Sequence, residues 1–345
     1  MRSYAARKYL PARRVFRTGR DAKPGVENVF LALEQDGAIA YGEAGPNPYF
    51  GESAENVHLR LLGLADFLRR QSLHAPEDIP RIWKEAEERL RPSRAALCAV
   101  DIALWDLWGK IAHRSAAHLA WGEDPKPIAS SVTLSVLKPG EFEARLEEVR
   151  DFPLVKVKMD GHADLTPLRR LRAAGVERLL VDANASWSSD QTIRLLPLLA
   201  ETGVEAVEQP LPPALDAEMP ALLKSSPLPL LADESCRVPE DVARMAGRFT
   251  GINIKLVKCG GLTPAMAMLA EARRLGLKVM VGCMLESSLL ISAGLALAQK
   301  ADWADLDGAW LLAEDPFQGL IFKDGRLGPN AAPGLGVAPV AKEET

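Results

Sequence analysis

From about residue 127 onward, the chain alternates short apolar runs with segments of helical periodicity. In the helical segments, such as 141–151, 164–175 and 263–276, apolar residues recur every three or four positions. Helix starts are indicated at Ser189 and at Thr263, where a threonine N-cap would precede a proline at the first helical position. The expected strands cover residues 127–135, 153–159, 178–184, 205–210, 228–235, 251–257, 277–283 and 303–308.

The spacing of these runs predicts the fold. The polar residue near the end of each run recurs at steps of 22 to 28 residues, from Thr133 to Asp305. Strands that alternate with helices at this period form parallel sheets, and eight strands with seven helices predict an α/β fold, a (β/α)7β modified TIM barrel. A doubly wound open sheet is the structural alternative, but no glycine-rich phosphate loop follows the first strand.

The first 122 residues follow a different pattern and predict an α+β capping domain. Residues 30–44 alternate apolar and polar positions around the turn Gln35-Asp36-Gly37, which is typical of an antiparallel hairpin, while 53–75 and 79–120 have helical periodicity. We expect the barrel domain at 123–314, and we expect the strand- and turn-rich segment 315–345 to return to the capping domain. The segments 16–27 and 46–53 are the expected lid loops over the barrel mouth.

Charged side chains at the strand ends are the candidate site. In a barrel strand alternate side chains point inward, so Lys156 and Lys158 both face the barrel interior. The next three strands end in acids, listed here in chain order: Asp182, Glu208 and Asp233. One such acid can be a helix cap, but three carboxylates around one point repel each other unless a cation lies between them. Carboxylate ligands with room for water and substrate suit Mg²⁺.

The lysines on either side of this centre indicate proton transfer. Lys158 ends the second strand and Lys255 ends the sixth, so they lie on opposite sides of the barrel mouth. A substrate carboxylate on Mg²⁺ would hold its α-carbon between the two amines. One amine would remove the α-proton, the metal would stabilise the enediolate, and the other amine would return a proton to the opposite face. Burial and the charge of Lys156 are expected to depress the pKa of Lys158.

Sequence motifs then place the chain near a known family. They span both domains: GEAGPNPYFGES, ALCAVDIALWDL, VKVKMD, VDAN, VEQPLP, ADESC, NIKLVKCGGLT, GCMLESS and ADLDG. Together they resemble the enolase superfamily, specifically its muconate-lactonizing subgroup, and are similar to its L-Ala-D/L-Glu epimerases. The resemblance implies that Lys158 and Lys255 are the acid/base pair and that the three strand-end carboxylates bind Mg²⁺.

The resemblance also implies how a dipeptide would be held. The eighth-strand motif of dipeptide epimerases binds the substrate ammonium, which corresponds here to Asp305 and Asp307. Buried carboxylates need a cationic partner, and the barrel lysines are required beside the metal, so a substrate ammonium fits. Arg20 falls where epimerases for acidic dipeptides carry an arginine for the glutamate carboxylate. Other expected substrate contacts at the strand ends are Lys156, Thr133, Cys283 and Met284. Glu286-Ser287-Ser288 after GCML leaves the side-chain specificity open.

Composition and the remaining motifs limit the alternatives. A net charge of −4 gives no basic face for nucleic acid, and no apolar run reaches the roughly 20 residues of a membrane span. The four cysteines have no CxxC spacing, which indicates free thiols and a cytoplasmic enzyme; a homo-oligomer is compatible with the sequence. No histidine ends the seventh strand, which disfavours an acid-sugar dehydratase. An o-succinylbenzoate synthase, N-acylamino acid racemase or muconate-type cycloisomerase remains the enzymatic alternative, and a catalytically inactive metal- or ligand-binding barrel is the other.

Overall fold

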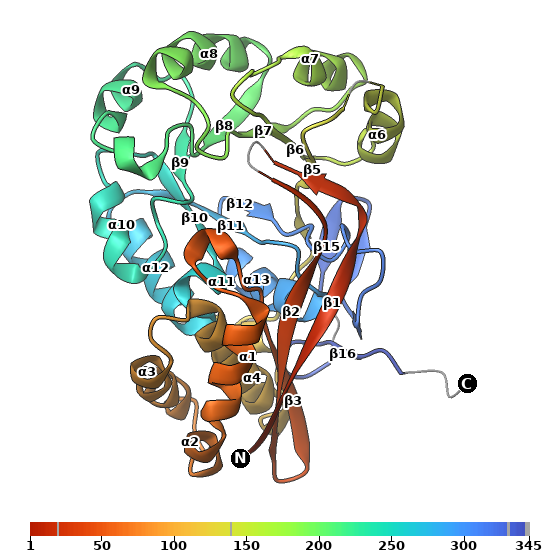
Figure 1. Ribbon diagram of the computed structural model, residues 1–345, viewed down its shortest axis with the longest axis vertical. Coiled ribbons are helices and arrows are strands. Elements are labelled where there is room, and N and C mark those ends of the chain that lie inside the picture. The colour runs from red at the N-terminus through yellow and green to blue at the C-terminus, as the bar shows by residue number, and fades with distance from the viewer. Residues whose placement is uncertain (19–20, 139, 330–331, 342–345) are drawn as a thin grey trace.

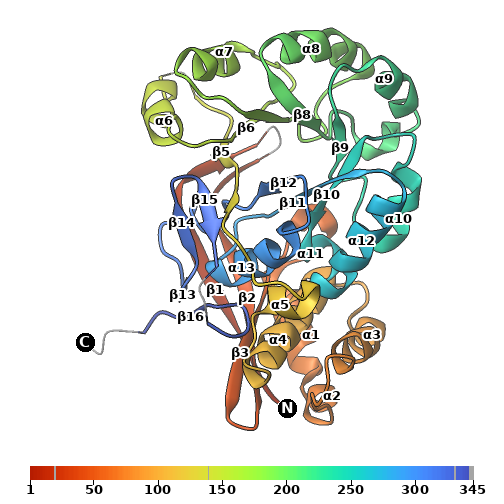
Figure 2. The ribbon, with the colours of Figure 1, turned by 180° about the vertical axis from the view of Figure 1, so that it is seen from behind.

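The computed structural model describes residues 1–345 except 19–20, 139, 330–331 and 342–345. A sheet-and-helix capping domain packs against one side of a β/α barrel (Figures 1 and 2). None of the helices in the described ranges is long and apolar enough to cross a membrane.

The capping domain is built on an antiparallel sheet. Strands β1 (Arg2–Arg17), β2 (Ala22–Gln35) and β3 (Ala38–Ala44) are neighbours in that order. Helix α4 (Arg94–Ile111) packs directly on β3, and a side chain on Gly42 would collide with the carbonyl oxygen of Ala99, 1.9 Å away. The other helices here are α1 (Ala54–Gly63), α2 (Ala65–Arg69), α3 (Asp78–Leu90) and α5 (Ala116–Trp121). The predicted β2–β3 hairpin is confirmed, with both Asp36 and Gly37 at positive φ.

The barrel has the predicted topology. In the part of the chain that the structure describes, eight parallel strands pair in chain order from β5 to β12, and each overlaps one predicted strand range. They are β5 (Val132–Leu134), β6 (Val155–Lys158), β7 (Leu179–Asp182), β8 (Val204–Glu208), β9 (Leu230–Ala232), β10 (Gly251–Lys255), β11 (Lys278–Gly282) and β12 (Trp303–Asp305). A hydrogen bond from Ser131 N to Ala304 O, 2.9 Å long, links the two ends of the sheet, so the barrel is nearly closed.

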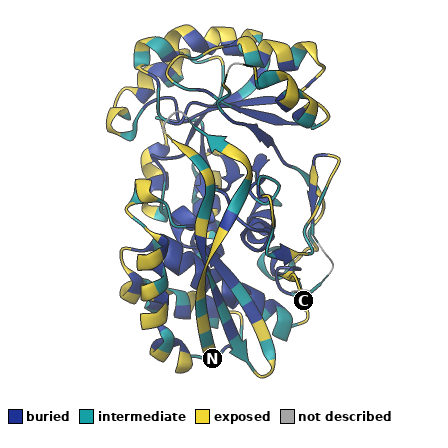
Figure 3. Ribbon diagram, turned by 45° about the vertical axis from the view of Figure 1, so that its right-hand side comes forward, coloured by how far each residue is buried: buried dark blue, intermediate teal, exposed yellow. Residues whose placement is uncertain are grey.

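Helices surround these strands, and the helices on the outside of the barrel turn their exposed residues outward (Figure 3). They are α6 (Phe142–Val149), α7 (Thr166–Ala173), α8 (Ser189–Glu201), α9 (Met219–Ser225), α10 (Pro239–Met245), α11 (Leu256–Cys259), α12 (Leu262–Arg274) and α13 (Ser288–Ala298). Helix α13 lies between the barrel and the capping sheet, and all of its residues are buried. Its lack of a polar face follows from this position, because protein covers it on every side.

Inside the barrel, the side chains form layers that follow the alternation of each strand. Six buried residues form an apolar cluster separate from the main core: Leu154, Leu180, Ala206, Leu231, Met280 and Trp303. Each lies two or four residues before a charged strand-end residue or Gly282. Its side chain therefore points to the same face of the strand as that residue. The apolar layer therefore fills the barrel interior below the charged layer.

Two segments differ from the sequence expectation. Residues 16–27 were expected to be a loop, but β1 extends to Arg17 and β2 begins at Ala22, so most of this range belongs to two paired strands. Residues 128–129 were assigned to the first barrel strand. They instead form β4 (Ile128–Ala129), which pairs with β15 (Arg326–Gly328) of the C-terminal segment. Strands of two or three residues are too short to show a hydrophobic period, so the sequence does not indicate which strand they pair with.

The C-terminal segment reaches back to the capping domain. Strand β14 (Ile321–Lys323) pairs with β15, and β13 (Phe317–Gln318) pairs with β16 (Ala338–Pro339). The Phe317 ring stacks on Phe30 of β2 with centroids 5.7 Å apart, and Leu335 N donates to Asp106 of α4 at 2.9 Å. These contacts agree with the expected return of the segment, while the domain boundaries at 122 and 314 remain predictions.

Candidate active site

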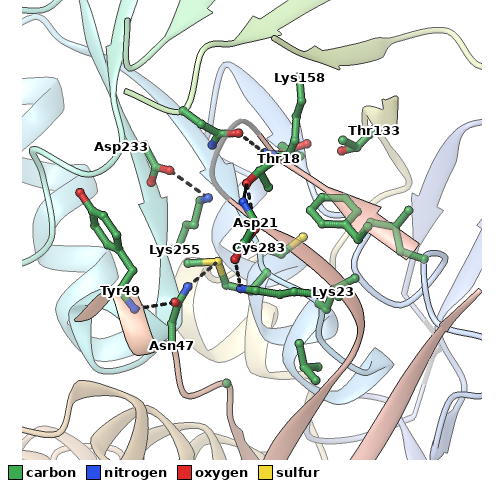
Figure 4. A pocket seen from close by; sticks show the side chains of 18 of the residues that line it. Thr18, Asp21, Lys23, Asn47, Tyr49, Thr133, Lys158, Asp233, Lys255 and Cys283 are labelled. Atoms are coloured by element: carbon green, nitrogen blue, oxygen red, sulfur yellow. Dashed lines mark hydrogen bonds and ion pairs between the residues drawn. The ribbon is translucent and has the colours of Figure 1, made fainter. Parts of the chain in front are cut away.

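A cavity of about 300 Å³ lies where the carboxyl ends of the barrel strands meet the capping domain. Both expected lid segments line it. The β1–β2 hairpin contributes Phe16, Thr18, Asp21, Lys23 and Val26, and the second segment contributes residues 45–50, which include a 3-10 turn at Pro48–Phe50. The barrel contributes Thr133, Lys156, Lys158, Asn184, Asp233, Glu234, Lys255, Cys283, Met284, Leu285, Asp305, Asp307 and Leu311. Figure 4 shows Lys158 and Lys255 reaching this cavity from different strands.

Charged residues lie side by side on neighbouring strands. The register of β6, β7 and β8 pairs Lys158 with Asp182 and Asp182 with Glu208. Lys158 Nζ lies 2.6 Å from Asp182 Oδ2, and the Asp182 side chain is fully buried. Burial raises the pKa of Asp182, but the positive charges of Lys158 and Lys156 outweigh it and lower that pKa to about 2. Asp182 is therefore an anion held against an ammonium group.

Lys156 lies deeper in the barrel, among three carboxylates. Its Nζ is 3.3 Å from Glu208 Oε2 and 3.6 Å from Asp182 Oδ2, and it also donates to Asp305 Oδ2. Glu208 accepts a further hydrogen bond from Asn253 Nδ2 at 2.6 Å. Burial first, and then the charge of Asp182, raise the pKa of Glu208 to about 8. Three carboxylates therefore surround the single ammonium group of Lys156.

The third carboxylate, Asp233, is held by lysines from both sides. Lys255 Nζ lies 3.0 Å from Asp233 Oδ2, and Lys258 Nζ lies 2.5 Å from Oδ1. In the β10–β11–β12 register, Lys255 pairs with Gly282, which pairs with Asp305. Because Gly282 has no side chain, the Asn253 side chain can lie against it, where an added Cβ would be 2.6 Å from Asn253 Oδ1.

The donor set fits a hard divalent cation. Asp182, Glu208 and Asp233 are buried oxygen donors at the ends of consecutive strands, and Asn253 Oδ1 is buried without a hydrogen-bond partner among the described residues. No three acidic, histidine or cysteine side chains in the described ranges form a ready-made metal cluster, because each of these carboxylates is turned toward a lysine. A cation would replace those ammonium groups in pairing with the carboxylates.

Neighbouring carboxylates dominate the electrostatic environment of Lys255 and Lys156. Burial lowers the pKa of Lys255, but the adjacent Asp233 and Glu208 outweigh burial and raise it above its ordinary value. Burial also lowers the pKa of Lys156, but the nearby carboxylates, above all Asp305, outweigh burial and raise that pKa. The sequence argument counted neighbouring cations and omitted the carboxylates that pair with them.

The two aspartates of the eighth strand have different surroundings. Asp305 accepts from Ser131 Oγ at 2.6 Å and from Lys156, so the expectation that the barrel lysines leave it unpaired is wrong. Asp307 accepts from the backbone N of Thr133 at 2.6 Å, and Cys283 Sγ lies 3.9 Å away. Burial and the charge of Asp305 raise the pKa of Asp307 to about 6. Asp307 therefore has no cation in direct contact within the described residues.

Some functional candidates were missed and one lies outside the described residues. Arg20, the expected partner of a glutamate side chain, is outside the described ranges. Lys23, which the sequence did not single out, lines the cavity with its Nζ 3.1 Å from Asp21 Oδ2. Lys258 and Asn253 were also missed as site residues. Asn253 could have been found from the sequence, because its position in the strand points its side chain into the barrel. Lys258 follows the strand, so strand alternation does not predict where its side chain points.

The capping domain and the barrel each match a family model. Residues 6–120 match the mandelate racemase / muconate lactonizing enzyme N-terminal domain, and residues 141–343 match the enolase C-terminal domain-like family. An L-Ala-D/L-amino acid epimerase of Maribacter sp. is 36% identical over 321 residues, covering 92% of this chain and 93% of the relative.

Solved structures agree with these matches. An enolase family member from Agrobacterium tumefaciens with homology to dipeptide epimerases, solved with sodium and L-Ala-L-Glu, is 35% identical with a TM-score of 0.86, covering 95% of this chain and 97% of that one. A dipeptide epimerase from Methylococcus capsulatus, complexed with Mg and L-Arg-D-Lys, is 32% identical with a TM-score of 0.90, covering 97% and 98%. The chain thus belongs to the mandelate racemase / muconate lactonizing enzyme family of the enolase superfamily.

Proposed function

We propose that this protein is a Mg²⁺-dependent isomerase, a dipeptide epimerase that inverts the α-carbon of the C-terminal residue. The observation that carries the proposal is the placement of Lys158 and Lys255 on β6 and β10, lining one cavity with Asp233 and Asp307. Inversion needs a proton-transfer group on each face of the carbon, and binding alone would not require both. The relatives named as epimerases, at 32–36% identity over nearly the whole chain, support the same reaction.

Different residues of this chain have different roles in the proposed reaction. Asp182, Glu208 and Asp233 would hold Mg²⁺, which supplies positive charge for the carboxylate of the substrate. One of the two lysines, as the free amine, takes the α-proton from its face of the carbon. The other, as the ammonium, delivers a proton to the opposite face. Because Lys158 and Lys255 each pair with a carboxylate that would bind the cation, cation binding would release both side chains toward the substrate.

The dipeptide N-terminus would be held at the end of β12. A buried carboxylate without a cation is costly, and Asp307 faces the cavity with only neutral donors in direct contact among the described residues. A substrate ammonium placed one peptide unit from the reacting carbon would be that cation. We assign this contact to Asp307 together with Asp305, whose second partner is Lys156.

We propose L-Ala-D/L-Glu as the substrate to try first. Lys23, whose ammonium group pairs with Asp21, lies on the lid side of the cavity, and Arg20 is proposed from the sequence to meet the glutamate carboxylate. The relative solved with L-Ala-L-Glu supports this choice, whereas the one solved with L-Arg-D-Lys shows that similar chains differ in the side chain they accept. A cytoplasmic location is proposed from the cysteines, all of them unpaired and buried.

Deuterium incorporation from D₂O tests the proposal. The protein is incubated with Mg²⁺ and a library of L-Ala-L-Xaa dipeptides, and α-proton exchange at the second residue is measured together with formation of the other epimer. Exchange with inversion supports an epimerase. No exchange with any dipeptide, but turnover of an N-acyl amino acid or o-succinylbenzoate precursor, would move the assignment to those enzymes. Exchange with none of these substrates would favour an inactive binding barrel.

A further inference from the structure

Lys258 is a buried lysine that the proposed reaction does not use. It lies in α11, directly after β10, and is 2% exposed. Its Nζ donates to Asp233 Oδ1 at 2.5 Å and to Asp233 O at 2.6 Å, and it lies 3.1 Å from both Cys236 O and Asn253 O. It is not among the residues that line the described cavity. A buried ammonium costs free energy unless it is fully paired, and here its acceptors come from two neighbouring segments of the barrel.

The two oxygens of Asp233 are held by different lysines. Lys255, which lines the cavity, pairs with Oδ2 at 3.0 Å, and Lys258, behind the strand end, pairs with Oδ1. Lys255 must reach the substrate and exchange protons during the proposed reaction. It therefore cannot also hold Asp233 in place, and the Lys258 contacts are the ones that persist when Lys255 moves.

We propose that Lys258 is a positioning residue: it fixes the outer oxygen and the carbonyl of Asp233 so that Oδ2 faces the cavity and its metal ion. This inference rests on the proposed function, because it takes Asp233 as a metal ligand. Loss of a partner that orients a metal-binding carboxylate typically lowers metal affinity or activity by about 10- to 100-fold. Lys258 also frees Lys255 from a structural role, which leaves that amine available for proton transfer.

Charge and orientation predict opposite effects, which makes the inference testable. If Lys258 acted only through its positive charge, removing it would strengthen Mg²⁺ binding, because a cation near the metal repels it. If it orients Asp233, removing it weakens Mg²⁺ binding. The geometry favours orientation, because Lys258 binds both the carboxylate and the backbone carbonyl of Asp233. It also contacts the backbone carbonyls of Cys236 and Asn253.

The experiment compares Lys258→Met and Lys258→Gln with an exposed control, Lys278→Met on β11. Magnesium binding is measured by calorimetry on the protein without dipeptide, and thermal unfolding is followed with and without Mg²⁺. We expect the Mg²⁺ dissociation constant of both Lys258 variants to rise by about 10- to 100-fold, and that of the control to match wild type. Lys258→Gln keeps amide donors for the neighbouring carbonyls, so it serves as the folded variant where Lys258→Met unfolds.

Two outcomes would overturn the inference. The first is Mg²⁺ affinity in folded Lys258→Gln that equals or exceeds that of wild type, which would leave Lys258 with a structural role or a purely repulsive one. The second concerns Asp233→Asn: if this variant binds Mg²⁺ like wild type, Asp233 is not a ligand and the proposed metal site fails first. Weak binding in both Asp233→Asn and the Lys258 variants supports the inference.

Discussion

Lys158 and Asp182 lie opposite each other on neighbouring strands, with the lysine nitrogen 2.6 Å from the carboxylate oxygen Oδ2. The same relationship occurs across the cavity, where Lys255 lies 3.0 Å from Asp233. Each proposed base is therefore paired with a proposed metal ligand. Since one carboxylate oxygen cannot hold an ammonium and a metal ion at the same point, metal binding and release of the two bases are coupled.

Removal of the metal should therefore stop catalysis on both faces of the substrate. We expect protein treated with EDTA to lose α-proton exchange from both L-Ala-L-Glu and L-Ala-D-Glu, and added Mg²⁺ to restore it. Asp233→Asn should abolish turnover while circular dichroism shows an intact fold, since the change removes charge and keeps the shape of the side chain. Full activity of metal-free protein would contradict the coupling.

The two aspartates of β12 should respond differently to the same change. Asp307→Asn removes the charge that meets the substrate ammonium, and loss of such a pair costs about 2–5 kcal/mol, so kcat/KM should fall by roughly two orders of magnitude or more. Asp305→Asn also removes the partner of Lys156 and should therefore lower kcat as well. Steady-state kinetics on L-Ala-L-Glu separate the two effects. Equal wild-type rates on L-Ala-L-Glu and its N-acetylated form would show that the ammonium is not recognised.

Gly282 should not tolerate a side chain. A methyl group there would lie 2.6 Å from Asn253 Oδ1 and 2.7 Å from Nδ2, and that amide nitrogen donates to Glu208. Gly282→Ala should lower stability by about 1–3 kcal/mol and weaken Mg²⁺ binding, because Asn253 has to move. Gly63→Ala in α1, where no atom lies within 4 Å of the added group, is the control. Urea unfolding and Mg²⁺ titration measure both effects; unchanged Mg²⁺ binding in Gly282→Ala would contradict the role of Asn253.

Glu43, fully buried at the end of β3, should make stability depend on pH. Burial raises its pKa to about 7, although Ser287 and Asn28 donate hydrogen bonds to it. The folded protein thus keeps this proton between the unfolded value of about 4.5 and about 7, where the unfolded chain has lost it. The contribution of Glu43 to stability therefore falls as the pH rises through this window.

Glu43→Gln removes that titration. Relative to wild type, the variant should gain stability by up to about 3 kcal/mol as the pH rises from 4.5 to 8. Urea unfolding of both proteins across this range measures the difference. Titrations of groups that do not interact with Glu43 cancel, whereas that of Glu286 does not, because Glu43 contributes to its raised pKa. A difference that stays constant with pH would show that Glu43 is ionised in the folded state throughout.

The barrel was predictable because its signals are local and repeated. Each strand carries its own apolar run and its own polar end, and the inward parity of Lys156 and Lys158 follows from the alternation within one strand. The carboxylates of β7 and β8 were predicted from their position at the end of each apolar run. These predictions depend only on residues that are close together in the sequence, so they do not require knowledge of how distant segments pack.

The remaining features depend on partners distant in the sequence. Thr263 was predicted to be an N-cap, but α12 begins at Leu262 and Thr263 donates through its backbone N, at 2.9 Å, and through its hydroxyl to Asp101 of α4. The capping domain thus supplies the cap of a barrel helix. The helix start predicted at Ser189 is confirmed, since α8 begins there, and the preceding Ser188 is its N-cap. The Lys156–Asp305 pair joins β6 to β12. No local sequence pattern shows that these two strands come close enough for the two side chains to meet.

The central claim is that two lysines act on opposite faces of one carbon. It is tested most directly by deuterium exchange in the single variants Lys158→Ala and Lys255→Ala, with L-Ala-L-Glu and L-Ala-D-Glu measured separately in D₂O and Mg²⁺. Each variant should fail to interconvert the epimers, and each should retain exchange of at most one epimer, a different one for each variant. Epimerisation by either variant at near the wild-type rate would contradict the two-base account.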